Sequence, residues 1–174
     1  TVTEIYDFLR LLFSRSGQQY CPNCNIPVDV HSAGEIVEEV RKMARKEADI
    51  AIYAPFIRKG AVEKKALIER VEKSGYEWLR INGQKIRIND LSKFLFEKDA
   101  LYNVELLIGV IADIKKQDPT RLVDTALELS GGMVTVAMAQ NDQVLSTTGL
   151  CTQCGSMMPV LDMRSFSFNS PYGA

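Results

Sequence analysis

The sequence is short of several features that would point to particular classes of protein. It contains a single histidine, His31, so most histidine-based catalytic sites cannot be built from it. Its apolar runs are shorter than ten residues, whereas a membrane-spanning helix needs about 20. No basic segment followed by an apolar stretch stands at the start, so no secretory signal is expected. These absences predict a cytoplasmic protein with no membrane partner.

The net charge is also small, at −1, which excludes a generally basic nucleic-acid binder. The charge is unevenly placed, however. Residues 35–98 hold 15 Lys and Arg against 11 Asp and Glu, whereas the rest holds 6 against 11. A basic middle segment favours an acidic partner, either phosphate or a carboxylate-rich protein surface. The same excess is also compatible with ordinary solvated helix faces.

Periodicity and turn residues predict a mixed α/β (α+β) fold of helices and strands in rough alternation. The first helix is expected to open at Thr3 and to end at Gly17, with one buried apolar face. A second begins at Ser32, where Glu35 completes a capping box. Asn82-Gly83 predicts a type I′ hairpin turn between strands at 78–81 and 85–88. The remaining expected elements are helices at about 61–74 and 118–129, strands at 50–54 (stopped by Pro55), 104–114, 133–138 and from 144, and a loop at 166–174.

Two Cys-x-x-Cys pairs carry the clearest chemical signal. Cys21 and Cys24 form one pair, and Cys151 and Cys154 the other. Two such knuckles supply four thiolates, which is the ligand set of a closed, structural zinc site. Although 126 residues separate the pairs, each doubling of a loop costs only about 0.6 kcal/mol. We therefore predict a zinc-bearing frame made of residues 1–31 and 146–174 around an inserted module at 32–145.

Other interpretations of the cysteines stay open. They include a redox Cys-x-x-Cys pair, two disulfides, unliganded core cysteines, and knuckles that use ligands outside this chain. His31 follows Cys24 by seven residues and is a further possible ligand, although four cysteines already fill a tetrahedral site.

No catalytic constellation is visible in the sequence. Neither a phosphate-binding loop nor a dinucleotide-binding glycine motif is present. Leu129-Ser130-Gly131-Gly132 is similar to the signature of ABC-type ATPases, but it follows a predicted helix instead of opening one. We interpret it as a helix stop with Gly131 or Gly132 as the cap. The chain by itself is therefore not expected to be an enzyme.

With these motifs in place, the chain resembles part of the UvrA family, the damage-sensing ATPase subunits of bacterial nucleotide excision repair. The resemblance is carried by three stretches in matching order. They are residues 1–15 leading into Cys21-Pro22-Asn23-Cys24, residues 125–132, and Ser165-Phe-Ser-Phe-Asn-Ser-Pro-Tyr-Gly-Ala174. The resemblance implies a fragment of the first ATPase half: part of signature domain I at 1–31 and 146–174, framing a UvrB-binding domain at 32–145.

The family resemblance also implies cofactors and partners. Structural zinc is implied within the fragment, and ATP only in domains absent from it. The implied partner is a UvrB-type helicase subunit, with DNA binding and a homodimer in the full-length protein. Because the family continues with another Cys-x-x-Cys after the equivalent of Ala174, Cys151 and Cys154 have an alternative set of zinc partners.

The residues implied to contact the partner are Arg58, Lys59 and Arg80, which match basic positions of the family. Two departures stand near them. Trp78 replaces the first arginine of the family's Arg-x-Arg pattern, and Gly109-Val110 replaces an Asp-Arg pair. Neither Trp nor Val can hold a carboxylate in a bidentate fork, so a partner contact there is expected to be reorganised. Trp78 could instead serve as an aromatic anchor, and packing within the core or the hairpin is an equally good interpretation. Direct DNA contact by the basic module, and a spacer in a divergent paralog that no longer docks UvrB, stay open as alternatives.

Overall fold

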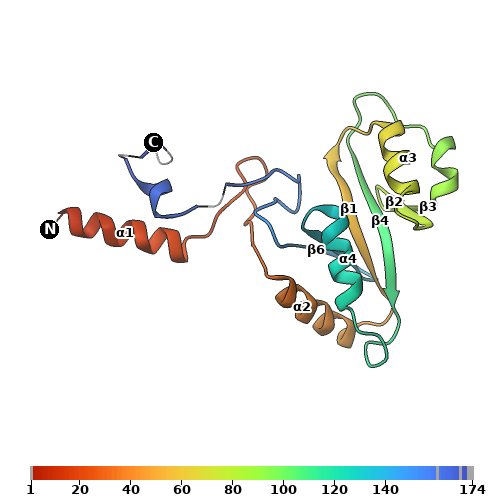
Figure 1. Cartoon of the computed structure of the whole chain (residues 1–174), viewed down its shortest axis with the longest axis horizontal. Coiled ribbons are helices and arrows are strands. Elements are labelled where there is room, and N and C mark those ends of the chain that lie inside the picture. Colours follow the sequence, from red (N-terminus) through yellow and green to blue (C-terminus); the bar gives the residue numbers. More distant parts are fainter. Residues whose placement is uncertain (1, 160, 169, 172–174) are drawn as a thin grey trace.

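The computed structural model describes residues 2–159, 161–168 and 170–171. Figure 1 shows an elongated chain with helix α1 (Val2–Ser16) at one end and a β-sheet covered by helices at the other. The two cysteine-bearing segments lie between them. His31 N–H donates to the carbonyl oxygen of Ser146 at 2.9 Å, so the predicted boundaries at 31/32 and 145/146 are neighbours in space. The division into domains itself stays a prediction.

The sheet has six strands, all antiparallel, in the order β3-β2-β4-β1-β5-β6. Long strands β1 (Ile50–Gly60) and β4 (Tyr102–Ile111) form its centre. The hairpin β2 (Trp78–Ile81) and β3 (Gln84–Arg87) extends one side, and β5 (Met133–Ala137) with β6 (Asp142–Ser146) extends the other. The predicted mixed α/β class is therefore confirmed, with an antiparallel sheet.

One face of the sheet carries the main hydrophobic core. Helices α2 (Ala33–Lys46), α3 (Lys64–Glu72) and α4 (Thr120–Ser130) contribute to the same buried cluster as the strands. Alternate strand residues such as Leu79, Leu106 and Val134 point into this cluster and are fully buried. Since side chains alternate between faces along a strand, the residues between them lie on the other face. That second face bears Trp78, Arg80, Lys85, Arg87, Glu105 and Thr135, and we call it the polar face.

Local sequence signals account for several element boundaries. The capping box at the start of α2 is present, with Ser32 and Glu35 each bonding the other's backbone N–H. Gly131 ends α4 in the left-handed region at φ 77°, as the helix-stop interpretation predicts. In the hairpin, Asn82 and Gly83 have φ of 46° and 85°, as a type I′ turn requires.

Several predicted boundaries are wrong: β4 ends at Ile111 and not at 114, and β6 begins at Asp142 and not at 144. Strand β1 continues through Pro55, because the pairing of β1 with β5 ends at Tyr53 and a register shift follows Pro55. Pro55 lies opposite Glu105 of β4 but has no partner on the β5 side, so its missing N–H is tolerated beside this bulge. Helix α3 begins at Lys64 and ends at Glu72, so it is shorter than the predicted span of 61–74. The short helices η1 (Ile88–Lys93) and η2 (Met163–Phe166) were not predicted, and residues 169 and 172–174 of the predicted loop lie outside the described residues.

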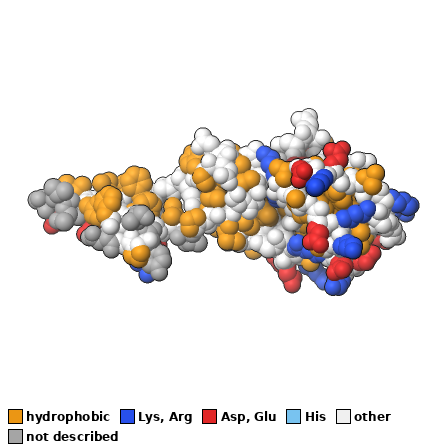
Figure 2. Space-filling view, turned by 90° about the horizontal axis from the view of Figure 1, so that it is seen from above, with side chains coloured by type: hydrophobic (Ala, Val, Ile, Leu, Met, Phe, Trp, Pro, Cys, Tyr) orange, Lys and Arg blue, Asp and Glu red, His pale blue; other side chains and the backbone are white. Residues whose placement is uncertain are grey.

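Helix α1 contacts the C-terminal segment instead of the sheet. Tyr6 Oη donates to the carbonyl of Phe166 at 2.8 Å, and the Tyr6 ring stacks on Phe168. The predicted burial of its apolar stripe is wrong in this chain: Phe13 stacks on Phe166 but is still 55% exposed, and Phe8 is 72% exposed. Figure 2 shows hydrophobic side chains gathered at this end and charged ones at the sheet end. Among the described residues, no helix is both long enough and apolar enough to cross a membrane.

Candidate metal centre and polar face

The two cysteine pairs adopt matching turns. In the first, Asn25 N–H donates to the carbonyl of Cys21 at 2.8 Å, and an isolated bridge joins Tyr20 to Pro27. In the second, Gly155 N–H donates to the carbonyl of Cys151 at 2.8 Å, and the bridge joins Leu150 to Met157. Each turn uses a residue at positive φ, Asn25 at 53° and Gly155 at 73°. Asn and Gly are the residue types that adopt this conformation most readily.

The matching turns bring all four sulfurs into one cluster. The Sγ atoms of Cys21, Cys24, Cys151 and Cys154 lie within 4.8 Å of one another. Those of Cys21 and Cys154, one from each pair, are 3.8 Å apart. A tetrahedral zinc ion with Zn–S bonds of about 2.3 Å needs sulfur–sulfur edges of about 3.8 Å. The sulfur cluster therefore fits one four-coordinate ion, and the four thiols are free, not joined as disulfides.

The electrostatics of the thiols also favour a shared cation. Hydrogen bonds with Ser156 lower the pKa of Cys154 to about 6, whereas desolvation raises the pKa of Cys24 to about 12. Burial likewise raises the pKa of Cys151, although backbone N–H groups of Cys154 and Gln153 bond to its sulfur and oppose the shift. Four thiolates this close repel one another, and a bound divalent cation removes that repulsion. His31 is not part of the cluster.

A small apolar core surrounds the sulfurs. Cys21, Val28, Cys151 and Met158 are buried in a cluster separate from the core of the sheet. This core is too small to hold the two chain segments together without help. Zinc bound by the four cysteines would supply structural energy there, and the closed ligand set leaves no position for catalysis.

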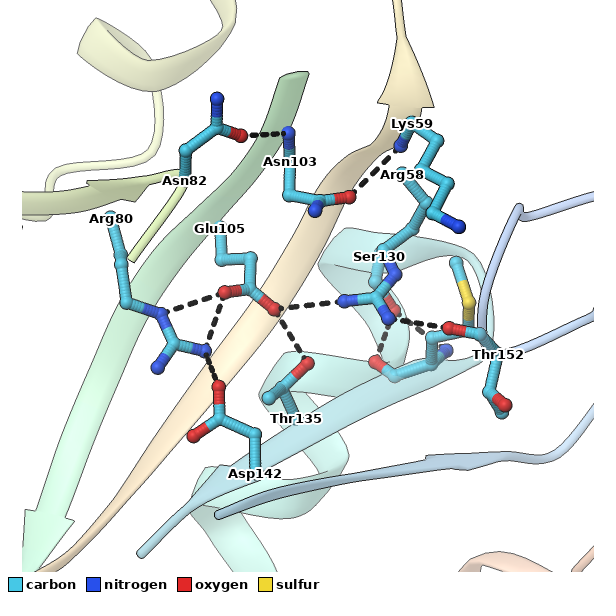
Figure 3. A network of polar contacts seen from close by, with 11 residues as sticks. Arg58, Lys59, Arg80, Asn82, Asn103, Glu105, Ser130, Thr135, Asp142 and Thr152 are labelled. Atoms are coloured by element: carbon cyan, nitrogen blue, oxygen red, sulfur yellow. Dashed lines mark hydrogen bonds and ion pairs between the residues drawn. The ribbon is translucent and has the colours of Figure 1, made fainter. Parts of the chain in front are cut away.

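The polar face carries a buried ion network centred on Glu105 (Figure 3). The Glu105 side chain is 5% exposed, and its carboxylate pairs with Arg80 Nη2 at 2.5 Å and with Arg58 Nη1 at 3.3 Å. Thr135 Oγ1 donates to the same carboxylate at 2.7 Å. Of the three sequence-predicted partner residues, Arg58 and Arg80 therefore point at Glu105 within the chain.

Arg58 also joins the sheet to the cysteine turns. Its Nη2 donates to the carbonyl of Thr152, between Cys151 and Cys154, at 2.5 Å. A Cβ placed on Gly155 would lie 3.3 Å from the Cβ of Arg58, so the turn and the arginine pack closely. The Nε atom of Arg58 is buried and has no hydrogen-bond partner among the described residues. Arg58 thus lies between the sheet and the candidate metal centre.

Arg80 is held by three groups at once. Besides Glu105, it pairs with Asp142 at 2.8 Å, and its guanidinium lies 4.2 Å from the centre of the Tyr53 ring. Burial lowers the pKa of Arg80, but the attraction of Glu105 and Asp142 outweighs it, so the pKa is raised and the charge is kept. Lys59 differs from both arginines, because its side chain is exposed while its backbone N–H bonds Asn103 at 2.9 Å.

The hairpin adds an exposed basic group that the sequence reasoning did not include among the partner residues. Lys85 Nζ lies 4.6 Å and Arg87 Cζ 5.0 Å from the centre of the Trp78 ring. Both cations are exposed, and both occupy β3, an edge strand. The sequence suggests Trp78 as a possible aromatic anchor, but it does not connect Trp78 with Lys85 and Arg87. The signal that could have found the group is the alternation Lys85-x-Arg87 opposite Trp78 across a predicted hairpin.

The second departure from the family has a packing explanation. A Cβ at Gly109 would lie 2.9 Å from a terminal carbon of Leu122 on α4, so glycine allows the helix to approach the strand. Val110 is 43% exposed. Neither residue offers a charge to a partner.

Comparison with known proteins identifies relatives of the chain. A family profile described as the UvrA interaction domain matches residues 31–140. UvrABC system protein A of Staphylococcus aureus (strain Mu50) is 39% identical over 180 residues, covering 100% of this chain and 18% of that protein. The proteins of the same name from Clostridium acetobutylicum and Haemophilus influenzae are each 34% identical, over 99% and 100% of this chain and 18% and 19% of their own lengths. The chain therefore belongs to the UvrA family, of whose members it spans about a fifth.

Proposed function

We propose that this chain is the partner-docking portion of a UvrA protein acting in nucleotide excision repair, and that it docks a UvrB-type subunit through the polar face. The observation that carries the proposal is the set of exposed cations around the buried ion network on that face. Glu105 and Asp142 offset the charges of Arg58 and Arg80 within the chain. The charges of Lys59, Lys85 and Arg87 remain available at the surface.

The chemistry of the polar face favours a partner surface rich in carboxylates. Exposed cations accelerate association with an acidic surface and orient it, and the effect weakens as salt is added. Trp78 offers an aromatic surface of the kind enriched at energetically important interface positions. Arg58 and Arg80 are 15% and 11% exposed. They would meet the partner only with the outer edge of each guanidinium, so Lys59 and the hairpin would make most of the charged contacts.

In this proposal the cysteine cluster binds one structural zinc ion. The ion would be held by Cys21, Cys24, Cys151 and Cys154, and a structural zinc is worth roughly 10–16 kcal/mol at neutral pH. It would hold the two cysteine-bearing segments together beside β1, where Arg58 donates a hydrogen bond to the carbonyl of Thr152. ATP binding, DNA binding and dimerisation are proposed for the remainder of the full-length protein, which this chain does not include.

The docking proposal is tested by calorimetry with UvrB from the same organism. We expect saturable binding at low salt that weakens as salt rises. The double variant Lys85→Glu with Arg87→Glu should weaken binding by at least tenfold. The control is Lys65→Glu with Lys73→Glu, which makes the same charge change at exposed positions in α3 and directly after it. The control should change the affinity by no more than about twofold. No binding of the unmodified chain at low salt would refute docking, and equal loss in both double variants would refute its location.

Direct DNA contact is a second candidate, supported by cations at the far end of the module. Arg45, Lys46, Lys115 and Lys116 line an open groove between the end of α2 and the segment after β4. Duplex binding through them would show a log affinity that falls linearly with log salt. If neither UvrB nor DNA binds, the structural-spacer alternative is favoured.

A further inference from the structure

The edge of the sheet formed by β6 lies beside a groove that the proposed UvrB contact does not use. The groove has a volume of about 700 Å³ and lies between β6 and the first turns of α2. It is lined by residues 143–146 and by one side of α2, on the core side of the sheet. β6 is the last strand of the sheet, opposite in position to the basic edge at β3.

The hydrogen bonds show which backbone groups of β6 face outward. Thr147 N–H donates to Gly132 at 2.8 Å on the β5 side, whereas the carbonyl of Ser146 accepts from His31 on the other side. Because backbone groups alternate in direction along an antiparallel strand, Val144 shares the orientation of Ser146. Its N–H and C=O therefore point to the outer edge, where no described strand pairs with them. The hydrogen bond from His31 N–H to the Ser146 carbonyl is of the kind that an added strand would form with this edge.

The side chains of the groove define the charge of a complementary ligand. Asp29, Glu35, Glu38 and Glu39 line it, and Lys42 is the one lysine or arginine among the described residues that line it. Glu35 stays ionised because the backbone N–H and hydroxyl of Ser32 hold its pKa low. Ile36 and Leu145 add apolar surface in the floor. A peptide in extended conformation could hydrogen-bond to the outward-facing backbone groups of Val144 and direct Lys or Arg side chains toward the carboxylates on α2.

We propose that the outer edge of β6 and the acidic side of α2 form a docking groove for an extended, basic peptide segment of a partner protein. The segment adds a seventh strand by bonding to Val144, and its cations lie against the carboxylates of the groove. This surface is separate from the polar face, so its occupation does not depend on the proposed UvrB contact.

The probe is a fluorescein-labelled nine-residue peptide alternating Lys and Thr, with the alternating Glu and Thr peptide as its control. Fluorescence anisotropy at low salt should show saturable binding of the lysine peptide only. Val144→Pro removes an N–H that serves no bond within the sheet, and proline is tolerated on an edge strand. It should weaken binding by about tenfold, whereas Val144→Thr should not.

A second pair of variants tests the charge. Asp29→Asn with Glu39→Gln should weaken binding by about threefold to tenfold, and Glu63→Gln with Glu69→Gln on the α3 side should not. Slower hydrogen exchange of the Val144 amide in the unmodified chain, on adding the peptide, tests strand addition without any variant. No saturable binding would overturn the proposal. Binding that ignores Val144→Pro and leaves that amide unprotected would also overturn it, since charge alone would then explain the affinity.

Discussion

Replacing Glu105 by glutamine tests whether the buried ion network holds the polar face together. The change keeps the side-chain shape and removes the charge that two buried arginines share. Removing one partner from a buried ion pair costs about 3–5 kcal/mol, because the other charge is left unpaired. Two contacts remain and moderate the loss: Arg80 keeps Asp142 at 2.8 Å, and Arg58 keeps the Thr152 carbonyl. We therefore expect the free energy of unfolding to fall by about 3 kcal/mol, at the lower end of that range.

The assay is urea unfolding of the zinc-loaded chain followed by circular dichroism. Asp142→Asn is the matched control, because it removes an outer carboxylate of the same network that is 42% exposed. Exposed ion pairs contribute about 0–1 kcal/mol, so its effect should be at most 1 kcal/mol. If Glu105→Gln also changes the stability by less than 1 kcal/mol, the network is not a structural centre and the reasoning fails.

Three further changes probe the local structure. Ser32→Ala should lower the free energy of unfolding by about 1 kcal/mol. It should also raise the pKa of Glu35 toward its ordinary value, which NMR titration would measure. Because the pKa of Glu35 is lower in the folded chain than in the unfolded one, this part of the stability is present above the unfolded pKa and is lost as pH falls through the folded pKa. Gly131 has φ 77° and open space around it, so Gly131→Ala should lower the free energy of unfolding by about 1 kcal/mol through backbone strain alone, as measured by thermal unfolding. Gly131→Asn should lower it by less, because Asn adopts this conformation more readily. Cys151→Ser should abolish stoichiometric zinc binding by mass spectrometry while the circular dichroism of the sheet persists, because the two cores are separate.

Much of the fold could be predicted because its signals are local. The capping box at Ser32, the Asn82-Gly83 turn and the glycine after α4 each act within a few residues, so the sequence alone is enough to place them. Pro55 was misinterpreted because its tolerance depends on where β5 stops pairing with β1, a long-range property. The apolar stripe of α1 was expected to be buried because periodicity shows that a face is apolar but not what covers it.

The candidate metal centre could be predicted for a different reason. Only four cysteines are present, in two equal pairs, so the tetrahedral demand of zinc limits the choices. The ion network could not be predicted in the same way. The family resemblance implies a partner role for Arg58 and Arg80, but the sequence does not show that Glu105, 25 residues after Arg80, lies beside them. Only the antiparallel register, with Arg80 opposite Glu105, brings them together.

The single tryptophan offers the most direct test of the docking surface. Trp78 is the only tryptophan in the chain, so a ¹⁵N-labelled sample gives one indole N–H signal from the centre of the exposed basic group. Titration with unlabelled UvrB at low salt should shift or broaden that signal in proportion to the bound fraction measured by calorimetry. Binding by calorimetry with an unchanged indole signal would contradict docking through the polar face.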